Sequence, residues 1–279
     1  MLNNSFSHIP SVGAKTERRI WSSGIRTMDD FLESPPEFLP LNKRKIIVDH
    51  IHLSKEKMRS KDAHYFSDNL PSREHWRIFK EYQDVTAYID IETTGLGAPG
   101  DIITTIALYD GKKISYFING KNLDNFKKEI QQYEVIVTYN GKTFDVPFIE
   151  SYFGISIPHS HIDLRYLLYS LGYSGGLKSC EKQLGIGRTG SLAEVDGFFA
   201  VLLWNDYESN RNEKSLETLL SYNIEDVLNL EYLMIEAYNR KLREIPLKLE
   251  TLNIPITPKN PFRIDKSTVK RIQNQYYYY

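Results

Sequence analysis

The chain has 279 residues, 41% of them hydrophobic and 25% charged, with a formal net charge of −1; this is the profile of a folded globular protein with room for one sizeable domain and a small one. Its single cysteine, Cys180, excludes an intrachain disulfide and favours a reducing, cytoplasmic location. Residues 1–13 lack the features of a secretory signal, and no apolar run reaches the length of about 18 residues that indicates a membrane span.

Short helices are expected in the first 60 residues. Pro10 and Gly13 indicate a tight turn, and a helix is expected directly after it, over residues 14–23. Thr27 is placed to cap a second short helix, and residues 41–60 have the apolar spacing of an amphipathic helix.

A domain boundary is expected in the polar, poorly periodic segment 62–71. We therefore expect a small all-α domain at residues 1–68, a linking helix that starts at Ser72, and a larger domain over residues 72–245. The tail, residues 246–279, contains four prolines, carries a net charge of +4 and ends in four tyrosines, which predicts an extension that wraps around the domain or is partly ordered.

The middle of the chain alternates between strands and helices. Strands are expected at residues 85–93, 102–110, 112–120 and 134–140, with a weaker one at 162–164. Helices are expected at residues 123–133, 145–154, 163–172, 177–185, 198–207 and 213–242. An initial meander followed by this alternation predicts an α/β fold with a mixed sheet flanked by helices.

Two acids stand in the first predicted strand. Asp90 and Glu92 are two residues apart and so share one face, while Ile89 and Ile91 share the other. Carboxylates inside an apolar strand are costly without a compensating cation. The plainer interpretation is a strand end whose acids are solvated.

Three further residues complete a candidate acidic centre. Asp145 follows the strand that ends near Asn140, where it could also cap the next helix. Tyr222 and Asp226 are four residues apart on a strongly helical segment and so share a face, where they could also form a surface pair. Carboxylates that converge repel one another unless cations lie between them, so these acids are a candidate two-metal site for phosphodiester cleavage.

The set and its order resemble the DEDD superfamily of 3′–5′ exonucleases, which have a ribonuclease H-like fold. The segments D-I-E-T-T-G (90–95), Y-N-G-K-T-F-D (139–145) and Y-N-I-E-D (222–226) are similar to the three family motifs. The histidine branch of the family has a histidine five residues before the last aspartate, where this chain has Ser221. The tyrosine branch, DEDDy, has a tyrosine four residues before it, and Tyr222 is at that position.

The resemblance implies a role for each of these residues. Two divalent ions, Mg²⁺ or Mn²⁺, would be bound by Asp90, Glu92, Asp145 and Asp226. Tyr222 would orient the attacking water. We expect contacts to the nucleic acid from Thr93, Thr94 and Asn140, because these residues follow the strands that carry the motifs.

The N-terminal segment I-P-S-V-G-A-K-T (9–16) resembles a helix-hairpin-helix element, in which backbone N–H groups at a helix start bind a phosphate. Ser11 stands where that pattern has its first glycine. Lys15, Arg18 and Arg19 lie close by and favour binding to nucleic acid. The alternative is a small helical domain that serves only for packing.

Charge is distributed unevenly along the chain. Residues 1–80 carry a net charge of +4, as does the tail, and residues 81–245 carry −9. Basic flanks around an acidic centre suit a nuclease that grips phosphates, although ordinary scatter of surface charge gives the same pattern.

The sequence therefore predicts a metal-dependent 3′–5′ exonuclease acting on a single-stranded 3′ end of DNA or RNA. The alternatives are a structure-selective or RNA-directed nuclease on the same fold, or a nucleic-acid-binding adaptor that has lost activity. No membrane partner is expected.

Overall fold

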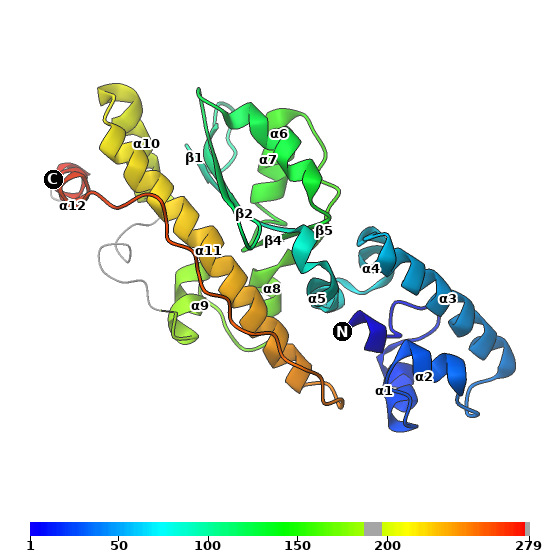
Figure 1. Cartoon of the computed structure of the whole chain (residues 1–279). Coiled ribbons are helices and arrows are strands. Elements are labelled where there is room, and N and C mark those ends of the chain that lie inside the picture. The colour runs from blue at the N-terminus through cyan, green and yellow to red at the C-terminus, as the bar shows by residue number, and fades with distance from the viewer. Residues whose placement is uncertain (187–196, 277–279) are drawn as a thin grey trace.

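A five-stranded mixed sheet packed between helices forms the larger part of the protein, and a helical region precedes it (Figure 1). The structure is a computed structural model that describes residues 1–186 and 197–276. This architecture confirms the α/β fold expected from the alternation of strands and helices. In the described part of the chain, no helix has both the length and the hydropathy needed to cross a membrane.

The sheet has the order β3-β2-β1-β4-β5. Its strands are β1 (Thr86–Thr93), β2 (Ile103–Tyr109), β3 (Ile114–Ile118), β4 (Val135–Thr138) and β5 (Ser160–Asp163). Strand β1 pairs antiparallel with β2 and parallel with β4, so it lies at the centre of the sheet. The pairing of β1 with β2 shifts between Glu92 and Thr93, and such irregularities bend a strand and re-aim its side chains.

The two faces of the sheet are covered by different helices. Ile89 and Ile91 pack in one apolar cluster with Ile149 of α7 (Asp145–Phe153) and with Phe126 of α6 (Phe126–Glu129). Tyr88 belongs to the opposite cluster, which includes many side chains of α11 (Glu213–Arg243). Asp90 and Glu92 alternate with the two isoleucines, so β1 directs its carboxylates to the face that α11 crosses.

Helix α11 is 31 residues long and is buried along much of its length. Asn212 caps it by accepting a hydrogen bond from the Lys214 backbone N–H. Its neighbours along the chain are α8 (Leu164–Tyr169), α9 (Leu177–Gln183) and α10 (Gly197–Asn210). These helices lie beside α11 (Figure 1).

The N-terminal helices share an apolar core with the larger part of the chain. They are η1 (Leu2–Asn4), α1 (Ala14–Ser22), α2 (Met28–Glu33), α3 (Leu41–Arg59) and α4 (His64–Asn69). One continuous cluster contains Phe6, Phe31 and Trp76 together with Tyr238 of α11. Arg77, in the connection, is buried against Glu17 of α1 with an N–O distance of 2.9 Å.

Three local expectations differ from the structure. The segment expected as a boundary, 62–71, contains α4, because Phe66 packs into the N-terminal core. The linking helix from Ser72 begins as the 3-10 helix η2 (Ser72–Ile78) before α5 (Phe79–Tyr82) and the 3-10 turn η3 (Gln83–Val85). The single helix expected at 123–133 is three short turns, η4 (Leu123–Asn125), α6 and η5 (Ile130–Gln132).

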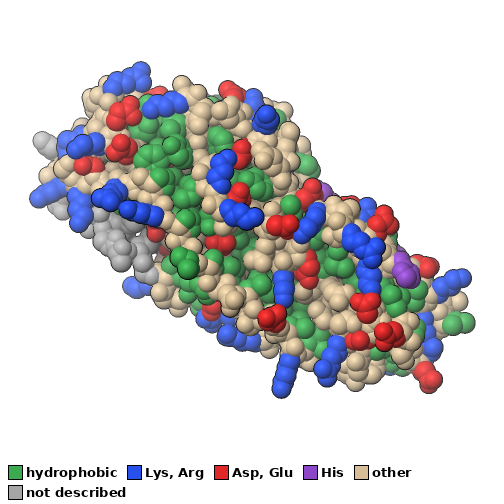
Figure 2. All heavy atoms as spheres, in the orientation of Figure 1, with side chains coloured by type: hydrophobic (Ala, Val, Ile, Leu, Met, Phe, Trp, Pro, Cys, Tyr) green, Lys and Arg blue, Asp and Glu red, His purple; other side chains and the backbone are tan. Residues whose placement is uncertain are grey.

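The C-terminal extension runs along α11 and ends in α12 (Lys266–Tyr276) (Figure 1). The Asn260 side chain donates to the Ser221 backbone oxygen at 2.8 Å, and Arg271 forms an ion pair with Asp206 of α10 at 2.6 Å. Of the four terminal tyrosines, the last three lie outside the described residues. On the face shown in Figure 2, basic and acidic side chains are interspersed both over α10 and α12 and over the N-terminal helices.

Candidate active site

The acidic residues converge between β1 and α11. One carboxylate oxygen from each of Asp90, Glu92 and Asp226 lies within 4.8 Å of the other two. Asp90 and Glu92 come from the same face of β1, and Asp226 comes from the helix that crosses that face. Glu92 and Asp226 are buried, and Asp90 is half-buried. Residues 136 positions apart in the sequence therefore contribute to one compact group.

Asp145 stands beside this group rather than within it. It is the first residue of α7 and is buried, and the helix-capping position belongs to Phe144. Its Oδ1 accepts a hydrogen bond from the Ile91 backbone N–H at 3.2 Å, between the two acids of β1. This bond ties the start of α7 to the centre of the sheet and turns Asp145 toward the other acids.

Burial and mutual repulsion make these carboxylates hard to ionise. Burial raises the pKa of Asp90 well above its ordinary value, and the charges of Asp226, Asp145 and Glu92 raise it further. Burial and the charges of Asp226 and Asp145 raise the pKa of Glu92 in the same way. The pKa of Asp145 rises to about 7, again chiefly through burial. A cation bound among them would relieve both costs.

Asn223 holds Asp90 in place and was not among the sequence-based predictions. Its Nδ2 donates to the Asp90 Oδ2 at 2.7 Å and to the Asp90 backbone oxygen at 3.2 Å. Its Oδ1 accepts from the Thr105 hydroxyl at 3.0 Å, which fixes the orientation of the amide. The only signal in the sequence is its position next to Tyr222, because its partners lie on distant strands.

Tyr222 and Lys178 lie together at the same cavity. Tyr222 precedes Asp226 by one helical turn on α11 and is 6% exposed. The Lys178 ammonium lies 4.9 Å from the centre of the Tyr222 ring, and its charge acts to lower the pKa of Glu92. Among the described residues that line this cavity, Lys178 is the one cation.

The acids line a cavity of about 520 Å³. Thr93, Thr94 and Asn140 line it as well, as expected, together with Leu96 and Phe198, two exposed apolar side chains that were not predicted there. The threonine hydroxyls shape the loop after β1. That of Thr93 donates to the Gly95 backbone oxygen, and that of Thr94 accepts from the Ile102 backbone N–H.

The donor set fits a hard divalent cation. Within the described residues, the compact group consists of carboxylates alone, with no cysteine or histidine among its ligand atoms. Oxygen ligands of this kind suit Mg²⁺ or Mn²⁺. The raised pKa values of Asp90 and Glu92 show that the protein holds these acids at a cost that a cation would offset.

The structure does not bring the N-terminal cations to this cavity. Lys15, Arg18 and Arg19 are exposed on α1, and the Arg19 guanidinium lies 4.3 Å from the centre of the Phe38 ring. The two histidines of the segment H-S-H-I-D (159–163) have hydrogen-bond partners within the fold. His159 bonds the Ile130 backbone oxygen, and His161 bonds the Thr138 hydroxyl.

Comparisons with known proteins identify the middle of the chain. A family model described as "RNase_H superfamily" matches residues 87–238, which contain most of β1 and of α11 and all four acids. No curated protein is significantly similar to the chain.

Three solved structures are distant neighbours. "Brucella melitensis NrnC with bound Mg2+" is 20% identical over 60% of this chain and 78% of that chain, with a TM-score of 0.41. "Brucella melitensis NrnC bound to pGG" is 19% identical over 60% and 77%, with a TM-score of 0.40. The family B DNA polymerase from the hyperthermophilic archaeon Pyrobaculum calidifontis is 16% identical over 56% of this chain and 29% of that chain, with a TM-score of 0.35. The family match alone carries the assignment.

Proposed function

The chain belongs to the RNase_H superfamily, and from this premise we propose that it is a metal-dependent 3′–5′ exonuclease of the DEDDy type that hydrolyses phosphodiester bonds in DNA or RNA. The observation that carries the proposal is the meeting of Asp90, Glu92 and Asp226 within 4.8 Å, with Asp145 and Tyr222 at the same cavity. An acidic group of this kind next to a tyrosine is unexpected in a domain that only binds or packs.

Under this proposal, each side chain has a defined task. Two Mg²⁺ or Mn²⁺ ions held by Asp90, Glu92, Asp145 and Asp226 would stabilise the attacking and leaving oxygens of the phosphodiester. Asn223 orients Asp90, since it bonds both the carboxylate and the backbone oxygen of that residue. Tyr222 orients the attacking water through its hydroxyl, and Thr93, Thr94 and Asn140 border the space for the terminal nucleotide.

We also propose a domain organisation in which each part of the chain has its own role. Residues 1–68 form a helix-hairpin-helix-like module that binds nucleic acid, residues 72–245 form the nuclease domain, and residues 246–279 form an extension. Support for the module comes from Ser11, whose φ of 64° is the left-handed conformation that glycine adopts readily. Ser11 thus adopts the backbone conformation that the first glycine of the helix-hairpin-helix pattern would have at this position. Lys15 and Arg18 are exposed on the helix that follows.

The test is cleavage of 5′-labelled single-stranded DNA and RNA in the presence of Mg²⁺, Mn²⁺ or EDTA, with Asp226→Asn as the control. We expect a metal-dependent ladder that shortens from the 3′ end and is absent in the variant. If neither single strand is cleaved, branched and duplex substrates would be tested next, and cleavage of those alone would instead support a structure-selective nuclease. Binding without any cleavage would support an inactive adaptor.

A further inference from the structure

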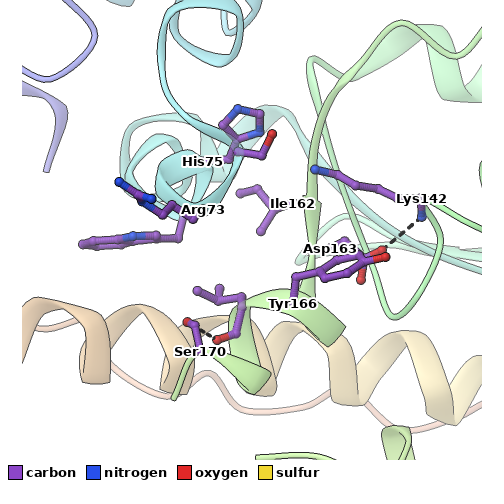
Figure 3. Close-up of a pocket in the computed structure, with 10 residues that line it drawn as sticks. Arg73, His75, Lys142, Ile162, Asp163, Tyr166 and Ser170 are labelled. Atoms are coloured by element: carbon purple, nitrogen blue, oxygen red, sulfur yellow. Dashed lines mark hydrogen bonds between the residues drawn. The ribbon is translucent and has the colours of Figure 1, made fainter. Parts of the chain in front are cut away.

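A second cavity, of about 370 Å³, lies outside the acidic centre (Figure 3). Arg73 and Trp76 of η2 and Tyr166 of α8 are among the residues that line it. Lys142, in the turn after β4, points its ammonium into it toward His75 and Ile162 (Figure 3). None of the four acids of the candidate active site lines this cavity.

Lys142 carries an incompletely neutralised charge. Its side chain is half-buried, and within the described part of the chain its ammonium has no hydrogen bond or ion pair. Asp163, which also lines the cavity, is the acid whose charge acts on Lys142. The Asp163 oxygens are engaged by the backbone N–H groups of Asn140, Lys142 and Arg165. A half-buried cation without a partner is costly, so this cavity favours an anionic ligand.

The residues that line the cavity also favour a ligand with a flat apolar group. Arg73 supplies another cation, 76% exposed, whose only ion pair in the described structure is with its neighbour Glu74 at 3.7 Å. Trp76, Tyr166 and Ile162 supply aromatic and aliphatic surface. A ligand that combines an anion with a flat apolar group matches both features, and a nucleotide unit of a nucleic acid is such a ligand.

The cavity is joined to the acidic centre by shared walls. Tyr166 also lines a neighbouring cavity, which is bordered in turn by Tyr139 and Asn140. Tyr139 and Asn140 both line the acidic cavity as well. Tyr166 and Tyr169, which lie along this route, are 52% and 72% exposed, so their rings are open to stacking.

We propose that this cavity is a distal subsite for single-stranded nucleic acid, in which Lys142 and Arg73 bind a backbone phosphate and Tyr166 contacts a base. The strand then runs along the tyrosine-lined surface, and its 3′ end reaches the acidic centre. This inference rests on the proposed exonuclease function, because only that function places a 3′ end there. DNA and RNA both present the phosphate and the base that the subsite requires.

The test compares strand lengths. Fluorescence anisotropy in EDTA would measure the affinity of the full chain for labelled dinucleotides and for strands of about 12 nucleotides, in DNA and RNA forms. We expect the wild type to prefer the longer strand. Lys142→Gln should narrow that preference by on the order of tenfold and reduce the salt dependence by about 0.7 in log–log slope.

Matched variants distinguish the loss of the subsite from the general effect of removing one positive charge. Lys112→Gln removes one positive charge from the exposed turn between β2 and β3 and should keep the wild-type length preference. Lys142→Arg keeps the positive charge and should keep the wild-type preference for the longer strand. Lys142→Gln retains the backbone N–H that bonds Asp163, so the turn is preserved, and equal melting temperatures would verify this.

The outcomes distinguish this inference from the proposed function. A wild type that cleaves the longer strand while Lys142→Gln behaves like Lys112→Gln would overturn the subsite alone. Equal loss of affinity for both lengths would also overturn it. A wild type that neither binds nor cleaves any strand would overturn both proposals. A larger effect with DNA or with RNA would identify the source of the bound phosphate.

Discussion

Asn223 donates its side-chain amide to both the Oδ2 and the backbone oxygen of Asp90, across 133 residues of sequence. The amide cannot rotate freely, because its oxygen accepts the Thr105 hydroxyl. The carboxylate of Asp90 is thereby held in one orientation by a residue that lies on α11, beside Tyr222. Groups that orient a metal ligand in this way affect metal affinity as well as activity.

We therefore expect Asn223→Ala to lower nuclease activity by about 10- to 100-fold and to raise the Mn²⁺ concentration needed for half-maximal activity. A metal titration of the cleavage rate would measure both. Asn239→Ala removes another buried amide from the same helix, one that bonds Leu252, and serves as the control. If both variants kept the wild-type metal dependence, Asn223 would have no positioning role.

Asp90→Asn should reduce cleavage by more than about 100-fold, since a proposed ligand is lost and not merely misoriented. The fold should remain intact, because the amide relieves repulsion among buried acids. Activity assays with circular dichroism would report both properties. Asp124→Asn, an exposed change on η4, is the control. Full activity of Asp90→Asn would refute the assignment of the site.

We expect the stability of the metal-free protein, measured in EDTA, to depend on pH through the buried acids of the cavity. The folded state retains a proton on Asp145 up to pH about 7, whereas the unfolded chain releases it near its ordinary value of 3.8. Folding therefore binds protons in this window, and stability falls as pH rises through it, by roughly 1–4 kcal/mol. Thermal melts at several pH values would measure the slope.

Two comparisons check the cause of that slope. Asp145→Asn cannot ionise and should make the slope shallower, while Asp90 and Glu92, whose pKa values are also raised, keep part of it. Added Mg²⁺ should flatten the slope in the wild type by favouring the charged forms. A stability in EDTA that rises steadily with pH over the same window would contradict the prediction.

Much of this arrangement could be read from local patterns. The two-residue spacing of Asp90 and Glu92 and the four-residue spacing of Tyr222 and Asp226 place each pair on one face, and the structure has both pairs at one cavity. Asn223 could not be found in this way, because its importance depends on two strands far away in sequence. The helix α4 was missed because its six residues are too few to show a period.

The N-terminal module is expected to contribute to the salt dependence of binding. Lys15→Gln combined with Arg18→Gln removes two exposed charges from α1 and should reduce the salt slope for a single strand by about 1.4. Binding titrations at several salt concentrations would test this. A slope equal to that of the wild type would mean that α1 does not touch the strand.

The buried contact between Glu17 and Arg77 is expected to be important for stability. Glu17 accepts hydrogen bonds from Ser5, from the Phe6 and Ser7 backbone N–H groups and from Arg77. Glu17→Ala would leave the buried guanidinium with Glu74 as its remaining carboxylate partner and would remove the acceptor of the Ser5, Phe6 and Ser7 donors, so it should destabilise the protein by about 3–5 kcal/mol. Urea unfolding would measure the loss. A change below about 1 kcal/mol would show that solvent replaces the carboxylate readily.

The position of Asp226 on α11 determines when the acidic group can assemble during synthesis of the chain. β1 emerges early during synthesis, but Asp226 joins its acids only when the chain has been made through the middle of α11. A contact this distant in sequence closes a large loop, which slows its formation. A ribosome-bound chain that ends before α11 therefore lacks the group of acids. Under the proposed function, the nascent chain should therefore be unable to cleave nucleic acid until α11 has been translated.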